Sequence, residues 1–167
     1  MIVGVASVWS EEKGLSDYVR LNERLNDNEV LVLVGVTKEQ AKDLPTNIVC
    51  IPRTESVDEL IGWYSLANVV LSLSKAETFG ITIAEAMACG TPVIVYDNTA
   101  QPELITEGTG YVAKDGDVDD VYHYIGLIKN SGAAYFQNKC RNKALEEFDN
   151  TRQFASYLQL YKTILKI

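Results

Sequence analysis

The sequence predicts an α/β fold, in which a parallel sheet of about six strands lies between two layers of helices. Short apolar runs rich in β-branched residues alternate with segments whose apolar residues recur every three or four positions, as in βαβ units. The apolar runs are continuous, which is typical of strands covered on both faces. A chain of 167 residues is long enough to bury a core, so we expect one domain over 1–167.

The first half of the chain supplies three strand–helix pairs. The expected order is strand 2–8, helix 14–26, strand 29–34, helix 38–44, strand 48–51 and helix 57–66. The run 2–8 is uninterrupted and β-branched, whereas the apolar residues of 14–26 have helical spacing. Pro45 ends helix 38–44, because proline lacks the N–H that a helix needs.

The second half completes the sheet and then becomes helical. We expect strand 69–73, helix 81–89, strands 92–96 and 110–113, and helices 118–129, 132–147 and 151–165. Gly90 follows helix 81–89 in the position where glycine commonly ends a helix. Helix 151–165 has a broad apolar face, which we expect to pack into the core; docking on another domain is the alternative.

The charge balance restricts the partners. The chain has 15 Lys and Arg against 23 Asp and Glu, a formal net charge of −8. Nucleic-acid affinity depends on neutralising phosphates with basic residues, so we expect no nucleic-acid partner. No apolar run approaches the roughly 20 residues of a membrane span, so we expect none.

The cysteines indicate a reducing compartment. Cys50, Cys89 and Cys140 are widely spaced and form no C-x-x-C pair, which disfavours zinc ribbons and thioredoxin-type sites. The N-terminus has no basic segment before its apolar run, unlike a signal peptide. We therefore expect reduced, mostly buried thiols in a cytoplasmic protein.

One loop carries the strongest functional signal. In open parallel sheets, ligands bind beyond the carboxyl ends of the strands, and segment 74–80 follows such an end. Gly80 allows close approach to the backbone, and the first N–H groups of the following helix suit an anion. Glu77 and Glu85 could accept hydrogen bonds from sugar hydroxyls. The alternative is a capped helix with two solvated carboxylates.

The sequence around this loop resembles a known signature. Residues 77–94 read E-T-F-G-I-T-I-A-E-A-M-A-C-G-T-P-V-I, similar to the E-x-F-G-x-x-x-x-E-A-x-A-x-G-x-P-V pattern of retaining glycosyltransferases of GT-B architecture, family 4. Segments 10–15 (S-E-E-K-G-L), 66–70 (L-A-N-V-V), 97–105 (D-N-T-A-Q-P-E-L-I) and 107–113 (E-G-T-G-Y-V-A) also look like that family. The resemblance covers about residues 1–128.

The resemblance implies the C-terminal, donor-binding half of a GT-B enzyme, a Rossmann-like domain without the N-terminal acceptor domain. It implies that Glu85 holds the donor ribose and that Glu77 lies near the transferred sugar. Lys13 would neutralise the diphosphate, and Arg53 would lie near the nucleobase. The catalytic candidates are Lys13 and Glu77. The donor-binding candidates are Lys13, Arg53, Glu77, Thr78, Phe79, Gly80, Ile81 and Glu85.

The implied function is transfer of a sugar from a nucleotide-sugar to a glycan or lipid-linked acceptor in cell-surface polysaccharide synthesis. A UDP-sugar is favoured over a GDP-sugar. The family uses no cofactor and no metal, and its members commonly work at the inner face of the membrane. We expect the isolated chain to be inactive, since the acceptor domain is missing. The alternative is a stand-alone nucleotide-sugar-binding module acting with a separate partner chain; a related GT-B epimerase fits the motif less well.

The sequence departs from the family at two places. Val8 stands where the family usually has the arginine of its first loop, so half of the expected diphosphate clamp is missing. Arg53 is the candidate for the second charge. Thr99 and Ala100 stand where the family has two glycines, which would bring side chains close to the sugar.

Other motifs have simpler interpretations. Asp115-Gly116-Asp117 matches a D-x-D metal motif, but it opens a helix, where acidic residues are favoured by the dipole alone. His123 is the only histidine, and its mid-helix position predicts a surface residue. The sequence has no P-loop and no dinucleotide-binding glycine pattern.

Overall fold

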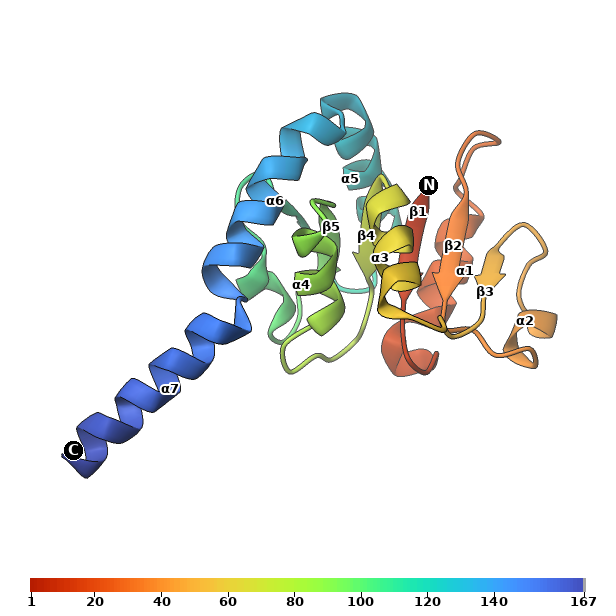
Figure 1. The fold of residues 1–167 in the computed structure, drawn as a ribbon. Helices are drawn as coiled ribbons and strands as arrows, with labels where there is room; N and C mark the ends of the chain where they lie inside the picture. Colours follow the sequence, from red (N-terminus) through yellow and green to blue (C-terminus); the bar gives the residue numbers. More distant parts are fainter. Residues whose placement is uncertain (167) are drawn as a thin grey trace.

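Six parallel strands form one sheet through the middle of the molecule in the computed structural model, which describes residues 1–166 (Figure 1). The strands are β1 (Ile2–Val5), β2 (Leu31–Val34), β3 (Val49–Ile51), β4 (Val69–Ser72), β5 (Val93–Tyr96) and β6 (Gly110–Ala113). Their order in the sheet is β3-β2-β1-β4-β5-β6, and every neighbouring pair is parallel. The predicted Rossmann-like α/β architecture is confirmed.

Helices cover both faces of the sheet. They are α1 (Leu15–Asn22), α2 (Gln40–Asp43), α3 (Val57–Leu66), α4 (Ile81–Ala88), α5 (Val118–Ser131), α6 (Ala133–Glu147) and α7 (Asn150–Leu165), with short 3-10 turns η1 (Glu11–Lys13) and η2 (Gln101–Leu104). Helices α1 and α5 pack together on one face, while α3, α4 and α6 pack on the other (Figure 1).

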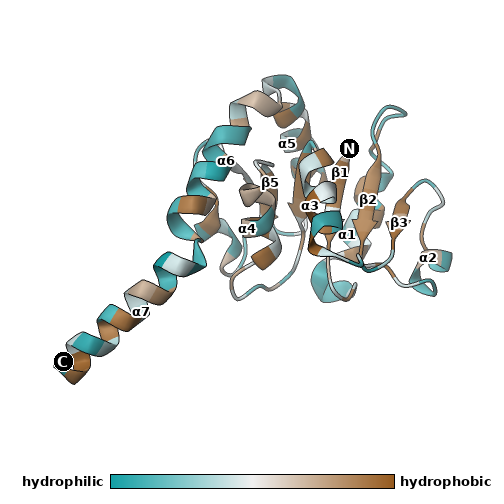
Figure 2. Cartoon of the chain, in the orientation of Figure 1, coloured by the Kyte–Doolittle hydropathy of each residue, from teal (hydrophilic) through white to brown (hydrophobic). Residues whose placement is uncertain are grey.

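The core lies along the sheet. Every residue of β2, β4 and β5 is buried, which explains why these runs are almost entirely apolar, with Ser72 at the end of β4 as the polar exception (Figure 2). Fully burying a valine, leucine or isoleucine side chain contributes roughly 1.5–3 kcal/mol. The central strands are therefore firmly held, and the loops that follow them start from a rigid base.

Several elements are shorter than the sequence predicts, among them the first strand and the first helix. The strand expected over 2–8 ends at Val5, because the chain turns and exposes Ser7 and Val8. Trp9 then turns back into the core, where its Nε1–H donates to the carbonyl oxygen of Val34 at 2.9 Å. The helix expected over 14–26 ends at Asn22.

The predicted packing of helix α7 into the core is wrong. The sequence predicts that its apolar face packs into the core, but none of its residues is buried. The helix extends away from the rest of the molecule, with apolar and polar residues alternating along it (Figures 1 and 2). Asp149, at φ −66° and ψ 119°, breaks the helical path between α6 and α7 and directs α7 outward. Amphipathic spacing predicts a helix with an apolar face, but not what that face contacts.

The remaining motifs behave as simple structural features. Asp117 caps α5 by accepting from the backbone N–H groups of Asp119 and Asp120 at 3.1 and 3.0 Å, and His123 is exposed, as predicted. All three cysteines are free, and burial raises the pKa of Cys140 to about 12. Within residues 1–166, no helix is both long and apolar enough to cross a bilayer.

Candidate functional site

A pocket of about 730 Å³ opens at the carboxyl ends of the central strands. It lies where chain connections leave β1 and β4 in opposite directions, the usual ligand crevice of an open α/β sheet. Its walls are the loops after β1, β3 and β4 and the start of α4. Every residue predicted for the site lines it: Lys13, Arg53, Glu77, Thr78, Phe79, Gly80, Ile81 and Glu85.

The loop after β1 is locked onto the end of β4. Gly14 has φ 74°, and a Cβ built on it would lie 2.1 Å from the carbonyl oxygen of Leu73. The N–H of Lys75 donates to the carbonyl oxygen of Glu12 at 2.8 Å. Only glycine permits this close approach, which brings Lys13 alongside the loop that carries Glu77.

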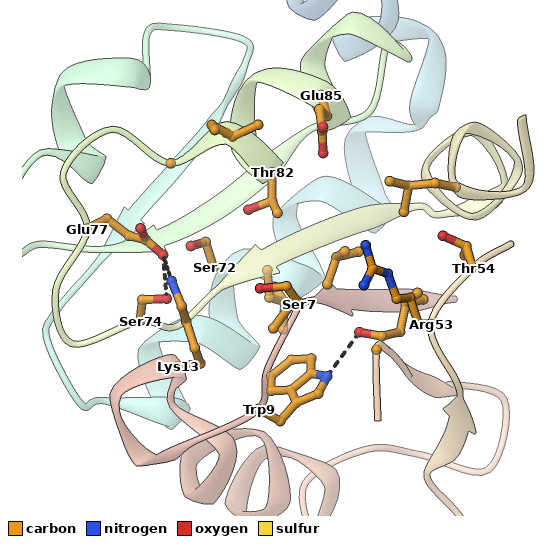
Figure 3. Close-up of a pocket in the computed structure, with 18 of the residues that line it drawn as sticks. Ser7, Trp9, Lys13, Arg53, Thr54, Ser72, Ser74, Glu77, Thr82 and Glu85 are labelled. Carbon is orange, nitrogen blue, oxygen red and sulfur yellow. Dashed lines mark hydrogen bonds and ion pairs between the residues drawn. The ribbon is translucent and has the colours of Figure 1, made fainter. Parts of the chain in front are cut away.

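Lys13 and Glu77 form an ion pair in this pocket. The Lys13 Nζ lies 2.5 Å from the Glu77 Oε1, and the Ser74 hydroxyl donates to the same oxygen at 2.9 Å (Figure 3). The Glu77 side chain is only 17% exposed, so water screens the pair incompletely. The expected phosphate cation and the expected sugar carboxylate thus neutralise each other, and an arriving anion would have to share Lys13.

A second loop clamps the backbone of Glu77. The Thr99 Oγ1 accepts from the Glu77 N–H at 3.0 Å, although Thr99 has a φ of 47°, which is unusual for a residue other than glycine. The fully buried Gln101 accepts from the Ser72 hydroxyl at 2.6 Å and donates to the Ser74 carbonyl at 2.9 Å. The threonine that replaces a family glycine therefore contacts the Glu77 backbone.

Gly80 sets the start of α4. It has φ 93°, and a Cβ there would lie 2.6 Å from the Cδ1 of Ile83. The first N–H groups of a helix lack partners within the helix and favour an anion. The side chains of Phe79 and Ile81 are 43% and 66% exposed, and the ring of Phe79 packs edge-to-face against Phe148 at 5.7 Å between centroids.

Glu85 lies one turn further along α4, and a tyrosine holds it. The Tyr64 hydroxyl donates to the Glu85 Oε2 at 2.8 Å. Within residues 1–166, this is the one hydrogen bond that the Glu85 carboxylate accepts. Sequence reasoning missed Tyr64, because it lies on α3 at a position that reads only as part of an apolar helix face.

Arg53 lies at the far side of the pocket from the Lys13–Glu77 pair. Figure 3 shows Arg53 beside Thr54 at one side, Lys13 and Glu77 at the other, and Glu85 directed toward the space between them. Lys13 and Arg53 are the cations that line the pocket, and no ion pair of residues 1–166 involves Arg53. Val8 is 69% exposed and is not part of the lining.

Several polar lining residues were not predicted from the sequence. They are Ser7, Thr54, Ser56, Ser72, Ser74 and Thr82. Small hydroxyl residues are common in loops, so the sequence offers no signal that separates these from the rest. Within the described part of the chain, no cluster of three or more His, Cys, Asp or Glu is arranged to hold a metal ion.

Known proteins are similar to this chain in part of their sequence and in fold. A family model described as "Glycosyl transferases group 1" matches residues 2–147. The N-acetyl-alpha-D-glucosaminyl L-malate synthase of Bacillus anthracis is 31% identical over 117 residues, which are 68% of this chain and 30% of that protein. A GDP-mannose-dependent alpha-(1-6)-phosphatidylinositol dimannoside mannosyltransferase of Mycobacterium tuberculosis is 32% identical over 97 residues, 58% of this chain and 25% of that protein.

A solved structure shows the same fold. HepE from Anabaena, in complex with UDP-glucose, has a TM-score of 0.78 and 22% identity, covering 95% of this chain and 48% of its own. The chain therefore spans about half of that structure and less than a third of each of the two relatives over the matched segments. The family match extends over most of the sequence and includes every loop that lines the pocket. This chain belongs to the glycosyl transferases group 1 family.

Proposed function

We propose that this chain is the donor-binding half of a retaining glycosyltransferase. The whole enzyme would transfer a sugar from a nucleotide-sugar to a glycan or glycolipid acceptor in cell-surface polysaccharide synthesis. One observation carries the proposal: the residues expected to hold diphosphate, sugar, ribose and base all line one pocket.

The order of these residues fits an extended ligand. Lys13 and Glu77 lie at one side, Arg53 lies at the other, and Glu85 lies between them (Figure 3). A nucleotide-sugar placed along this line has its sugar and diphosphate near Lys13 and Glu77, its ribose at Glu85 and its base near Arg53. Clefts of roughly 300–1,000 Å³ are usual for small-molecule ligands, and this pocket of about 730 Å³ falls in that range.

The proposed chemistry depends on the leaving group. When the bond between the sugar and the diphosphate breaks, negative charge grows on the departing phosphate oxygen. The Lys13 ammonium and the N–H groups at the start of α4 stabilise that charge. Glu77, paired with Lys13, stays close to the sugar and positions its hydroxyls. No metal or cofactor enters this proposal.

A UDP-sugar is the proposed donor, with a GDP-sugar as the alternative. HepE binds UDP-glucose, whereas the mycobacterial relative is described as GDP-mannose-dependent. These two proteins support either base as a candidate, and the loop that carries Arg53 would decide between them here. Calorimetric titration distinguishes them directly.

The acceptor would be held by a second domain, in the same polypeptide or in a separate partner chain. The exposed apolar face of α7 is available to such a domain, and the chain covers about half of HepE. We place the enzyme in the cytoplasm, peripheral to the inner membrane face, where glycolipid acceptors are accessible.

The proposal is tested by titrating the chain with UDP, GDP and ADP at moderate salt. We expect saturable binding of one nucleotide and its loss or strong weakening in Glu85→Ala. A folded chain that binds none of the three would contradict the proposal that this half binds the donor by itself. Testing the same nucleotides against the chain together with an acceptor domain would then show whether the pocket forms only in the complete enzyme.

A further inference from the structure

Tyr64 contacts the carboxylate that the proposed function assigns to the ribose, and nothing in the sequence marks it as part of the site. We propose that Tyr64 is a positioning residue, which fixes the Glu85 carboxylate so that its free oxygen meets the donor ribose. The inference rests on the proposed function, because it assumes that Glu85 binds a ribose.

The Tyr64 side chain has almost no freedom to move. It is 1% exposed and lies in the last turn of α3, where that helix packs against α4. Its hydroxyl reaches the Glu85 Oε2 at 2.8 Å. A buried ring of this size keeps one orientation, so the hydrogen bond fixes the carboxylate rather than following its motion.

The backbone of Tyr64 is anchored as well. The Thr91 hydroxyl donates to the Tyr64 carbonyl oxygen at 2.7 Å, and Thr91 is itself only 4% exposed. Thr91 lies two residues before β5, a fully buried strand of the sheet. This hydrogen bond fixes the position of Tyr64 relative to the sheet, the most rigid part of the molecule.

The chemistry suits recognition of a diol. A carboxylate only accepts hydrogen bonds, and it offers two oxygens. With Oε2 engaged by Tyr64, Oε1 is the oxygen left to accept from ribose hydroxyls. Glutamate has several rotatable bonds, and a ligand that finds it already ordered does not have to order it on binding.

The phenol remains a donor under ordinary conditions. Burial, and next the hydrogen bond to the Glu85 carboxylate, raise the pKa of Tyr64 above its usual value. The hydroxyl therefore stays protonated at neutral pH. A neutral donor also leaves the Glu85 charge in place, so the carboxylate remains a strong acceptor for the ligand.

A matched pair of variants tests this role. Tyr64→Phe removes the hydroxyl that donates to Glu85. Tyr96→Phe removes a hydroxyl from another buried tyrosine, which donates to the Asp17 Oδ2 at 2.9 Å and does not line the pocket. Both variants lose one hydrogen bond to a carboxylate, but only the first touches the proposed ribose site.

Each protein is titrated with UDP and with 2′,3′-dideoxy-UDP, which lacks both ribose hydroxyls. We expect the unmodified chain to prefer UDP and Tyr64→Phe to weaken UDP binding roughly 3–10-fold, the range of one hydrogen bond. Binding of dideoxy-UDP should barely change, so the preference shrinks by the same factor. Tyr96→Phe should keep the preference of the unmodified chain.

The outcomes separate the two proposals. If the unmodified chain binds none of UDP, GDP and ADP, the proposal that this half binds the donor by itself fails, and the inference fails with it. If it binds UDP with a clear ribose preference that Tyr64→Phe preserves, the positioning role alone is overturned. Equal weakening of both ligands would also overturn it, since that indicates general support of the pocket.

A second measurement does not depend on any variant folding. In the unmodified chain, the hydroxyl proton of a buried, hydrogen-bonded tyrosine exchanges slowly and can be followed by NMR. We expect the Tyr64 signal to persist, at a shifted position, when UDP saturates the site. Accelerated exchange and loss of that signal on binding would show that Glu85 leaves Tyr64, contrary to the proposal.

Discussion

The two glutamates of the pocket are held in opposite ways. Glu77 is already neutralised, because Lys13 lies 2.5 Å from its Oε1 and the Ser74 hydroxyl donates to the same oxygen. Glu85 is held at 2.8 Å by the neutral hydroxyl of Tyr64, which leaves its charge uncompensated. One side of the pocket carries an ion pair that a ligand must open, whereas the middle of the pocket carries a carboxylate oxygen that is free to accept hydrogen bonds from a ligand.

This difference indicates how the two sides respond to a ligand. A diphosphate competes with Glu77 for Lys13, so the energy gained at the phosphate is reduced by what the ion pair loses. A ribose displaces only water from Glu85. We therefore expect substitutions of the two glutamates to act in different directions on nucleotide binding, although both residues lie on the same loop–helix segment.

The largest effect is expected from Glu85→Ala. It removes the charged acceptor for the ribose, and hydrogen bonds to charged groups contribute about 1.5–3 kcal/mol. Nucleoside diphosphate affinity should fall roughly 10–100-fold, measured by calorimetry. Glu107→Ala, an exposed carboxylate outside the pocket, is the control. Unchanged affinity in a folded Glu85→Ala variant would refute the ribose role.

Lys13→Ala should have the next largest effect. The loss of the cation should weaken UDP binding roughly 10-fold and leave uridine binding nearly unchanged, because only the diphosphate needs the charge. The same titrations at increasing salt should show a smaller salt dependence than in the unmodified chain. Lys75→Ala is the control, since Lys75 pairs with Glu11 outside the pocket. Equal losses for uridine and UDP would contradict a phosphate role.

Glu77→Gln should act in the opposite direction on UDP. The amide keeps the shape of the side chain but frees Lys13, so UDP should bind as well as before or a few-fold, about 2–5-fold, more tightly. The advantage of UDP-glucose over UDP should shrink, because Glu77 is the proposed sugar contact. Competition between the two ligands measures this ratio. A parallel loss of affinity for both would make Glu77 a general pocket residue.

Thr99→Gly should have the smallest effect. It removes the oxygen that accepts from the Glu77 N–H at 3.0 Å, but it also relieves a φ of 47° that glycine adopts freely. The two contributions oppose each other, so the free energy of unfolding in urea should change by less than about 1 kcal/mol. UDP affinity should not change. A tenfold loss would mean that this loop also controls the nucleoside side.

The fold was predictable because the patterns that indicate its strands and helices each lie within a short stretch of sequence. The continuous apolar runs at β2, β4 and β5 and the helical spacing between strands predict the parallel sheet, and the structure confirms it. The packing of α7 was not predictable. Its amphipathic pattern is real, but whether the face contacts the body depends on the direction the chain takes at Asp149.

The site was predictable to the extent that it lies in one motif. The segment that carries Glu77, Gly80 and Glu85 is continuous in sequence, and the structure brings it together with Lys13 and Arg53. The contacts that hold the Glu85 carboxylate and the Glu77 backbone come from residues that are distant in sequence. Tyr64 and Thr99 each lie more than twenty positions from their partners. Tyr64 belongs to no recognisable pattern, and Thr99 stands where the sequence departs from the family pattern, which does not predict its contact with the Glu77 N–H.

We propose that one pocket holds a nucleotide with its ribose at Glu85 and its diphosphate at Lys13. A crystal structure of the chain with UDP tests it most directly. We expect ribose hydroxyls within hydrogen-bond distance of Glu85, the diphosphate beside Lys13 and the start of α4, and the base on the Arg53 side. A nucleotide bound in the reverse direction, or outside this pocket, would contradict it.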